Sequence, residues 1–337
     1  MPRVDNGGEG RADPVGGDYV VDVVTMGETM IQLNAFTSGP LRYVNYFEKH
    51  AAGTESNVAV GVVRMGYSAG WISRLGNDEL GKYIYNFLRG EGVDVSQVRF
   101  DSEAPTGLYF VQRDYPIPGK SVVYYYRRGS AASRLGPNDV DEEYISSARV
   151  FHTTGITVAL SASCREAVDK AIGVARKSRT QVSFDTNIRL KLWGPEEAKE
   201  GLLGYIDLAD ILFTDINDSQ ILLGKDEPSE AAGEFLSMGP RTVIVKMGDK
   251  GAYAVTSKGE SAFKPAYKVP VIDVIGAGDA FDSAFICSRL RGFDLDKSLE
   301  LANAAGALCV TVRGDVEAIP TLKEAESFLA GKEHFLR

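Results

Sequence analysis

Asp273-Val274-Ile275-Gly276-Ala277-Gly278-Asp279 is the stretch of this chain that decides its predicted fold. Apolar residues alternate at strand period over residues 267–271 before it, and they follow helical spacing over residues 280–290 after it. The small residues of the stretch therefore fall where a helix begins. A helix N-terminus has unpaired N–H groups and a partial positive charge, and small residues let an anion approach the backbone. The stretch predicts an anion-binding turn.

Asp279 follows this turn within the first helical turn. The helix dipole and the nearby N–H groups favour its ionised form at neutral pH. An ionised carboxylate beside an anion-binding turn suits a base that takes a proton from an attacking hydroxyl. The seven residues alone are equally compatible with a plain glycine turn in which Asp279 only stabilises the helix.

Composition limits the kinds of protein that this chain can be. It has 337 residues, 44% of them hydrophobic, which predicts one large core with a small appendage rather than two equal domains. A net charge of −9 disfavours a nucleic-acid surface, so bound anions must be held by local features. The cysteines, Cys164, Cys287 and Cys309, are scattered and predict neither a disulfide framework nor a thiolate metal site. The histidines share no zinc-ligand spacing.

No window is apolar over the length of a membrane helix, and the first residues lack the order of a signal peptide. We therefore expect a soluble, cytoplasmic protein with no membrane partner. Residues 1–18 are rich in glycine and polar residues and predict a disordered extension before a folded domain at residues 19–337.

Strands and helices alternate along most of the chain, which predicts an α/β fold with a mainly parallel sheet and helices on both faces. In such sheets ligands bind beyond the carboxyl ends of the strands. The predicted strands are residues 19–26, 71–75, 97–100, 150–154, 181–185, 209–214 and 242–246, and the predicted helices are residues 58–65, 78–91, 164–177, 195–205, 230–238, 280–290, 298–309 and 322–329.

Residues 106–128 interrupt this alternation. Two β-rich runs, residues 107–113 and 121–128, are joined by a short polar segment and predict a hairpin. Together with strand-like residues between 34 and 50, the hairpin predicts a small sheet, called the lid below. A small sheet buries little on its own, so the lid should close on a ligand or pack on a partner subunit.

The stretch at residues 273–279 resembles the D-T-x-G-A-G-D signature of the ribokinase-like, phosphofructokinase-B type sugar kinases, with Val274 at the usual Thr position. The resemblance implies a three-layer fold with a mainly parallel central sheet and a small β lid. In that family the turn is the anion hole for the transferring phosphate and the last Asp is the catalytic base. Those roles fall on Gly276, Ala277, Gly278 and Asp279.

The same family uses ATP and Mg²⁺, and further motifs match its nucleotide side. The segment at residues 246–252 resembles the K-x-G-x-x-G turn whose backbone lines the nucleotide, although alone it is compatible with any turn between two strands. The nucleotide residues that the resemblance implies are Asp215, Lys246, Gly248, Gly251, Gly276, Gly278 and Asn303. Residues 313–315 are assigned to a wall of the nucleotide pocket.

Residues 215–218, Asp-Ile-Asn-Asp, occupy the place of a family N-x-x-E motif that orders water around Mg²⁺. Asp218 keeps an acidic group at the last position and remains compatible with magnesium held through water. An alternative of equal weight is that Asp215 or Asn217 caps a helix at residues 218–223.

Two arginines distinguish the acceptor side. An arginine binds a carboxylate with two parallel hydrogen bonds, whereas neutral sugars are usually bound by Asp and Asn, so Arg127 and Arg189 favour an acidic sugar. The alternative is that both are solvated surface charges. Gly53 and Asn57 resemble a family G-G-x-x-x-N-x-A pattern that contacts substrate hydroxyls, with Ala52 at the first glycine; the ordinary interpretation of Asn57 is a first-turn helix residue.

Longer segments at residues 40–50, 107–109, 115–118, 125–133, 154–157 and 184–193 together resemble the 2-keto-3-deoxygluconate kinases, and the archaeal branch in particular. The resemblance implies phosphorylation of the 6-hydroxyl of 2-keto-3-deoxygluconate and, in many archaeal relatives, of its galactonate epimer. It places Gly53, Tyr109, Tyr125, Arg127, Ile156 and Arg189 in the acceptor pocket.

Other interpretations remain open from sequence. The nearest is a ribokinase-like kinase for a neutral sugar, such as fructose or ribose, or for a nucleoside. A non-catalytic sugar-acid-binding protein would not need the base and the glycine turn. We also expect a homo-oligomer, at least a dimer, formed through an apolar lid face that includes Tyr43, Tyr46, Phe47, Phe110 and Tyr124.

Overall fold

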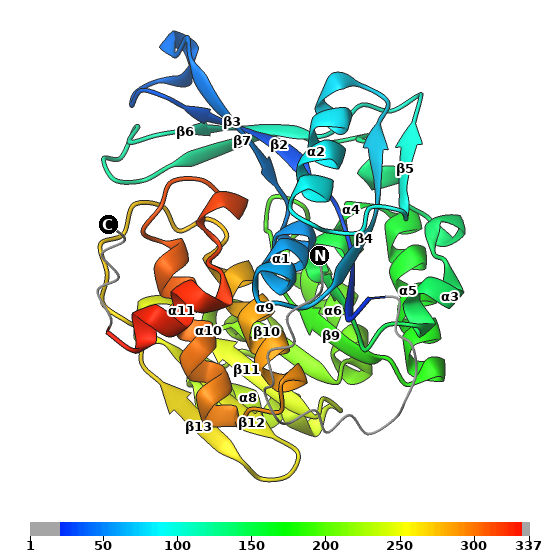
Figure 1. Cartoon of the computed structure of the whole chain (residues 1–337), viewed down its shortest axis with the longest axis vertical. Helices are drawn as coiled ribbons and strands as arrows, with labels where there is room; N and C mark the ends of the chain where they lie inside the picture. Colours follow the sequence, from blue (N-terminus) through cyan, green and yellow to red (C-terminus); the bar gives the residue numbers. More distant parts are fainter. Residues whose placement is uncertain (1–20, 332–337) are drawn as a thin grey trace, which may run out of the picture.

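The computed structural model describes residues 21–331, so the predicted extension at residues 1–18 and His334 lie outside the described residues. At the centre is a nine-stranded sheet with the strand order β13-β12-β11-β10-β9-β8-β1-β4-β5 (Figure 1). Neighbours from β11 to β5 pair in parallel, and β12 is antiparallel to both of its neighbours. The predicted mainly parallel sheet is confirmed. The strands are β1 (Val23–Met26), β4 (Ala69–Gly76), β5 (Val98–Asp101), β8 (Val150–Thr154), β9 (Gln181–Asp185), β10 (Ile211–Asp215), β11 (Thr242–Lys246), β12 (Ala252–Thr256) and β13 (Ser261–Lys264).

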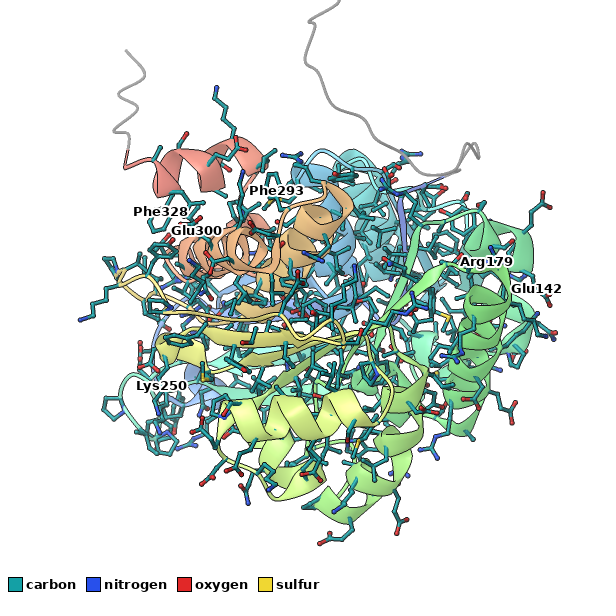
Figure 2. The ribbon with its side chains drawn as sticks, turned by 90° about the horizontal axis from the view of Figure 1, so that it is seen from below. Glu142, Arg179, Lys250, Phe293, Glu300 and Phe328 are labelled. Carbon is teal, nitrogen blue, oxygen red and sulfur yellow. The ribbon has the colours of Figure 1, made fainter. Side chains whose placement is uncertain are left out.

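Helices cover both faces of this sheet (Figure 2). Successive side chains of a strand point to opposite faces, so in β10 Ile211 and Phe213 join one apolar core while Leu212 joins the other. The first face is covered by α1 (Thr54–Arg64), α2 (Glu79–Gly90), α9 (Ala277–Leu290), α10 (Leu295–Cys309) and α11 (Leu322–Leu329). The second is covered by α3 (Glu142–Ser146), α4 (Gly155–Leu160), α5 (Ala162–Ser178), α6 (Pro195–Leu208), α7 (Ile216–Leu223) and α8 (Pro228–Ser237). Among residues 21–331 no helix combines the length and the apolar character that a membrane crossing requires.

The lid is a separate four-stranded sheet at the top of Figure 1, in the order β3-β2-β6-β7. Its strands are β2 (Met30–Ala35), β3 (Phe47–Ala52), β6 (Leu108–Gln112) and β7 (Val122–Tyr126). β6 and β7 pair in antiparallel register from Leu108 opposite Tyr126 to Gln112 opposite Val122, so the predicted hairpin is confirmed. β2 begins before the predicted segment at residues 34–50.

The run at residues 267–271, whose apolar residues alternate at strand period, does not form a strand. Residues 265–276 have no strand structure, although their apolar residues alternate. β13 is the last strand of the sheet, and after it the chain crosses to α10, where Ile272 N donates to Val310 O at 2.8 Å. Tyr267, Val269 and Val271 line a cavity instead of a sheet. The alternation therefore reflects side chains that face a cavity on one side. In sequence, such a cavity wall has the same pattern as a strand.

Candidate active site

The glycine turn at the start of α9 lies between two cavities. Gly276 caps the helix with φ of 79°, a left-handed conformation that disfavours any side chain. A Cβ at this position would also lie 2.8 Å from Asp315 Oδ1, so both backbone and space require glycine. One cavity has a volume of about 480 Å³ and the other about 520 Å³. The residues common to both walls are Lys246, Gly248, Val274 and Gly278.

The first cavity, called the acceptor cavity below, is lined by every residue predicted to contact substrate. They come from the N-terminus of α1, the lid strands β6 and β7, the start of α4 and the loop after β9. Gly276, Gly278 and Asp279 line the same cavity. The fold therefore brings the predicted substrate residues beside the predicted base. These substrate residues are Gly53, Asn57, Tyr109, Tyr125, Arg127, Ile156 and Arg189.

Asp279 is held by two donors from the first turn of α1. Thr54 Oγ1 donates to Oδ1 at 2.5 Å, and Asn57 Nδ2 donates to Oδ2 at 2.7 Å. Burial raises the pKa of Asp279 above 3.8, while the two hydrogen bonds and the charge of Lys246 lower it. The sequence predicted only the stabilising effect of the helix N-terminus. Because the residue is 9% exposed, desolvation opposes that effect, and a carboxylate with a raised pKa is a stronger base.

Asn57 uses both hydrogens of its amide nitrogen on carboxylates. Besides Asp279, Nδ2 donates to Asp315 Oδ1 at 2.5 Å, and Asn57 Oδ1 is buried with no partner among the described residues. Asn57 is thus a first-turn helix residue, and it also lines the acceptor cavity. Asp315 lines the acceptor cavity too, so assigning residues 313–315 to the nucleotide wall was wrong for this residue. Burial and the Asp279 charge raise the pKa of Asp315.

Arg127 is held by a buried acid from the main domain. Its Nε donates to Glu28 Oε2 at 2.7 Å, its Nη2 contacts the same oxygen, and Ser130 Oγ donates to Oε1 at 2.5 Å. Glu28 is 2% exposed and sits just after β1. Nη1 of Arg127 has no hydrogen-bond partner within residues 21–331. The alternative that Arg127 is a solvated surface charge is therefore wrong, because its side chain is 10% exposed and lies between the lid and the main domain.

Arg189, in the loop after β9, is exposed and forms no ion pair with any residue between 21 and 331. It lines the acceptor cavity, so its guanidinium is available to an acidic ligand. Tyr109 is 6% exposed, and its hydroxyl accepts a hydrogen bond from Gln32 Nε2 at 2.9 Å. Its ring lies 5.4 Å from that of Tyr125, which is 39% exposed. The lid therefore contributes one fixed and one accessible tyrosine.

The second cavity, called the nucleotide cavity below, contains five of the seven residues predicted on that side: Lys246, Gly248, Gly251, Gly278 and Asn303. The other two, Asp215 and Gly276, line the acceptor cavity instead. Gly251 has φ of 106°, and a Cβ there would lie 2.0 Å from Lys264 O. The Nδ2 group of Asn303 donates to Lys264 O at 3.0 Å and to Pro265 O at 3.3 Å. Asn303 thus fixes the wall of the cavity, and its amide hydrogens already have partners.

Lys246 lies beneath the turn between the two cavities. Its Nζ is 2.9 Å from Asp185 Oδ2 and 3.0 Å from Asp282 Oδ1. Burial lowers the pKa of Lys246, but the charges of these two acids outweigh burial and raise it. A Cβ at Gly278 would lie 3.6 Å from Nζ. The ammonium group therefore stays charged directly behind the glycine turn.

The two acids of the segment at residues 215–218 make different contacts. Asp215 Oδ1 accepts from Asn217 N at 2.7 Å and Asp218 N at 2.8 Å, so Asp215 caps α7, as one of the two interpretations held. The helix begins at Ile216 instead of residue 218. Asp218 accepts from Thr186 Oγ1 at 2.6 Å, and burial raises its pKa to about 7. Both acids line the acceptor cavity.

No group of three or more His, Cys, Asp or Glu side chains in the described part of the chain could enclose a metal ion. Two carboxylates at the cavity wall still fit Mg²⁺ held through water on a bound nucleotide, since Mg²⁺ prefers oxygen ligands and keeps several waters.

Comparisons with known proteins decide the family. The family model of the pfkB family carbohydrate kinases matches residues 21–322. The chain belongs to the pfkB family. The 2-dehydro-3-deoxygluconokinase of Thermoproteus tenax is 50% identical over 315 residues, covering 93% of this chain and 95% of that protein. The 2-dehydro-3-deoxygalactonokinase of Haloferax volcanii is 34% identical over 315 residues, covering 92% and 97%.

A solved structure supports the same placement. A protein from E. coli described as a ribokinase II, in complex with ATP and Mg²⁺, superposes with a TM-score of 0.86 at 30% identity, covering 93% of this chain and all of that one. This pfkB kinase therefore has the predicted ribokinase-like fold with its small β lid.

Three residues of the candidate site, Glu28, Thr54 and Asp282, were not predicted from sequence, and Asp315 was predicted at the wall of the other cavity. Glu28 follows a predicted strand, so its position at the carboxyl end of that strand was visible in sequence. Its contact with Arg127 was not. Asp282 comes one helical turn after the catalytic signature, so its spacing from Asp279 placed it on the same helix face. The contacts of Thr54 and Asp315 carried no comparable signal, since each joins residues more than 200 positions apart in sequence.

Proposed function

We propose that this pfkB kinase transfers the γ-phosphate of ATP to the 6-hydroxyl of 2-keto-3-deoxygluconate, also called 2-dehydro-3-deoxygluconate, in the presence of Mg²⁺. The identity to the Thermoproteus tenax kinase supports the acceptor, and the E. coli complex supports ATP and Mg²⁺. The observation that carries the proposal is that Arg127 and Arg189 line the same cavity as Asp279 and the glycine turn. The cavity thus holds cationic groups for an acid and a base for a hydroxyl.

Asp279 takes the proton of the 6-hydroxyl while the hydroxyl oxygen attacks the γ-phosphorus. The bond between the γ-phosphorus and the β,γ-bridging oxygen breaks, and ADP leaves. Thr54 and Asn57 hold one carboxylate oxygen each, so the base has a fixed orientation before the substrate arrives. The backbone N–H groups of the turn at residues 276–278 stabilise the charge of the transferring group at the α9 N-terminus. Asp218 would hold Mg²⁺ through water, and the bound ion would supply positive charge beside the phosphates.

The acid end of the acceptor is bound by the two arginines. Glu28 occupies the Nε side of Arg127 and leaves Nη1 for the ligand. Because Arg127 comes from the lid and Glu28 from the main domain, the pair also fixes the lid over the cavity. Lys191 Nζ adds a second link by donating to Val123 O at 2.6 Å. A carboxylate bound here would complete a bridge between lid and main domain.

We infer that 2-keto-3-deoxygalactonate, the C4 epimer, is a second acceptor. The relative from Haloferax volcanii is named for that substrate, and the two tyrosines of the lid differ in how firmly they are held. Tyr109 is fixed by Gln32, whereas Tyr125 is 39% exposed and free to adjust. We expect a loose selection at C4.

The lid also offers a surface for a second copy of the chain. Tyr43, Tyr46 and Tyr126 are 72%, 75% and 65% exposed. Phe110 joins the same face, with its ring 5.2 Å from Phe47 and 5.7 Å from Tyr126. We infer a homodimer through this face, because a small sheet cannot otherwise cover its apolar side. Tyr126→Glu should convert a dimer to a monomer in light scattering, and Phe263→Glu, at an exposed phenylalanine on β13, is the matched control.

The place of action follows from the reaction. We infer that the enzyme works in the cytoplasm, where ATP is available and where its three unpaired, buried cysteines would stay reduced.

The test of the function is an ADP-release assay with MgATP and five separate acceptors: 2-keto-3-deoxygluconate, 2-keto-3-deoxygalactonate, gluconate, fructose and ribose. Turnover of both keto-deoxy acids and slow or absent turnover of the others is expected. Turnover of only a neutral sugar would be consistent with Asp279 as the base, but it would contradict the binding of an acid by Arg127 and Arg189. A protein that binds the acid without releasing ADP would be a binding protein and not a kinase.

A further inference from the structure

Glu55 is a buried acid that the proposed phosphoryl transfer does not use. It is 0% exposed, lies in the first turn of α1 and lines neither cavity. Its Oε2 atom is buried with no hydrogen-bond partner within residues 21–331, and burial raises the pKa of Glu55 to about 7. A buried carboxyl with one unpaired oxygen costs free energy, so packing alone does not account for an acid at this position.

The other oxygen of Glu55 holds the start of α4. Oε1 accepts hydrogen bonds from Thr154 Oγ1 and Thr157 Oγ1, both at 2.7 Å. Thr154 is the N-cap of α4, and its hydroxyl oxygen accepts from Ile156 N at 3.2 Å. Because Glu55 takes the hydrogen of this hydroxyl, the oxygen is left to cap the helix. Glu55 therefore fixes the segment that places Ile156 in the wall of the acceptor cavity.

Glu55 also lies against the chain just after β1. A Cβ at Gly27 would lie 2.1 Å from Glu55 Cδ, so only glycine leaves room for the carboxyl group. The next residue is Glu28, whose carboxylate holds Arg127. The segment that anchors the acid-binding arginine thus packs directly on Glu55.

The neighbours of Glu55 on α1 hold the base. Thr54 donates to Asp279 Oδ1, and Asn57 donates to Oδ2. The helix itself is fixed by the apolar side chains of residues 58–62, which belong to the core. The position of the base is therefore set by contacts other than those of Glu55. What Glu55 fixes is the position of α4 and of the Gly27–Glu28 segment relative to the base.

Three parts of the site thus meet at one buried carboxyl: the helix that holds the base, the wall at Ile156 and the anchor of Arg127. We propose that Glu55 is a positioning residue that keeps the acid-binding end of the acceptor cavity in register with the base. An acceptor held by its carboxylate at Arg127 then presents its 6-hydroxyl to Asp279 in a reactive geometry. The inference rests on the proposed function, because it requires an acceptor with an acid at one end and the reacting hydroxyl at the other.

The test compares transfer to the sugar acid with transfer to water. Glu55→Ala should lower kcat for 2-keto-3-deoxygluconate about 10- to 100-fold, the cost of displacing a reacting group by about 1 Å. ADP release without an acceptor should stay within about twofold of native, because water is not anchored at Arg127 and the base keeps both of its donors. Glu55→Gln should keep most of kcat, since its Oε1 still accepts from both threonines.

Thr157→Val is a second variant, which removes one donor to Glu55 and keeps the shape of the side chain. Thr157 is buried and lines neither cavity. In the native background this variant should lower kcat about threefold to tenfold, because a hydrogen bond of this kind contributes about 1 kcal/mol. In a Glu55→Ala background it should change kcat less than about twofold, because its partner is already absent. It also tests the proposal if Glu55→Ala does not fold.

Asp139→Ala is the matched control. Asp139 is 2% exposed and its Oδ2 accepts from Arg74 Nε at 2.8 Å, outside both cavities, so its loss should lower the melting temperature and leave both rates unchanged. An equal fall of the two rates in Glu55→Ala would overturn the proposal, because the effect would then lie on the base itself. A native kcat in Thr157→Val would overturn it too, as would a Glu55→Gln variant as slow as Glu55→Ala. A native enzyme that turns over no sugar acid would reject the proposed acceptor first, before any variant is made.

Discussion

The acceptor cavity and the nucleotide cavity meet at one glycine turn, yet they are built in different ways. Charged and polar side chains line the acceptor cavity, and most of them are held by one another, as in the contacts of Glu28 with Arg127 and of Asn57 with Asp279. The nucleotide cavity is lined largely by apolar residues and glycines, and Asn303 directs its amide hydrogens to backbone. We infer that side-chain chemistry selects the acceptor and that backbone shape binds the donor.

The largest expected effect is on the base itself. Asp279→Asn should lower kcat about 10³-fold, because general base catalysis contributes that order, while the affinity for nucleotide stays near native since the side chain faces the acceptor cavity alone. Steady-state turnover and nucleotide titration measure the two quantities separately. If the mutant kept most of its kcat, Asp279 would not be the base. The proposed functional difference between the two cavities would then also be rejected.

The second effect sharpens the acceptor side. Arg127→Ala should raise KM for 2-keto-3-deoxygluconate about 10- to 100-fold, since a hydrogen bond to a charged group is worth about 1.5–3 kcal/mol. KM for ATP should not change, because Arg127 lines only the acceptor cavity. Lys297→Ala, at a surface cation that lines neither cavity, is the control. An equal rise in both KM values would mean that the two cavities are not independent.

A third effect concerns pH. Asp279 must be ionised to accept a proton, and burial raises its pKa above 3.8, so kcat/KM should fall with decreasing pH at a higher pH than for an ordinary aspartate. Asn57→Ala removes a hydrogen bond that lowers this pKa, so the fall should move to still higher pH. Asp218, whose pKa burial raises to about 7, is excluded as the source if Asp218→Asn keeps the same profile. An unchanged profile in Asn57→Ala would contradict the assignment.

The smallest effect is expected on the donor side. Asn303→Ala removes hydrogen bonds of 3.0 and 3.3 Å to the backbone at Lys264 and Pro265, and a neutral hydrogen bond contributes about 1 kcal/mol. KM for ATP should rise about threefold to tenfold, with acceptor KM unchanged. A much larger rise in this KM would indicate that Asn303 contacts the adenine of ATP directly. That result would contradict the inference that backbone shape binds the donor.

Much of the fold was predictable because it depends on local periodicity. β9, β11 and α11 begin and end at the predicted residues, since each is a clear apolar pattern bounded by polar residues. The extended run expected at residues 267–271 is not a strand, because a wall that faces a cavity has the same alternation as a strand.

The site residues also differ in how far they could be predicted, depending on whether they belong to a local motif. Gly276 and Asp279 belong to one short signature, so sequence alone pointed to them. The contacts of Arg127 with Glu28 and of Asn57 with Asp315 join residues 99 and 258 positions apart. Contacts of that kind depend on tertiary packing of the lid and of the loop after α10, which a single sequence does not encode in a readable pattern.

The shared wall of the two cavities has a consequence for inhibitor chemistry. Because Gly278 and Val274 face both cavities, the acceptor cavity and the nucleotide cavity are adjacent compartments that share part of their wall. A bisubstrate compound, in which a keto-deoxy acid is tethered through a short polyphosphate chain to adenosine, would occupy both at once and avoid the second loss of translational freedom. The tether length that gives the tightest binding would depend on the geometry of the turn. It would therefore report the distance between the donor and the acceptor.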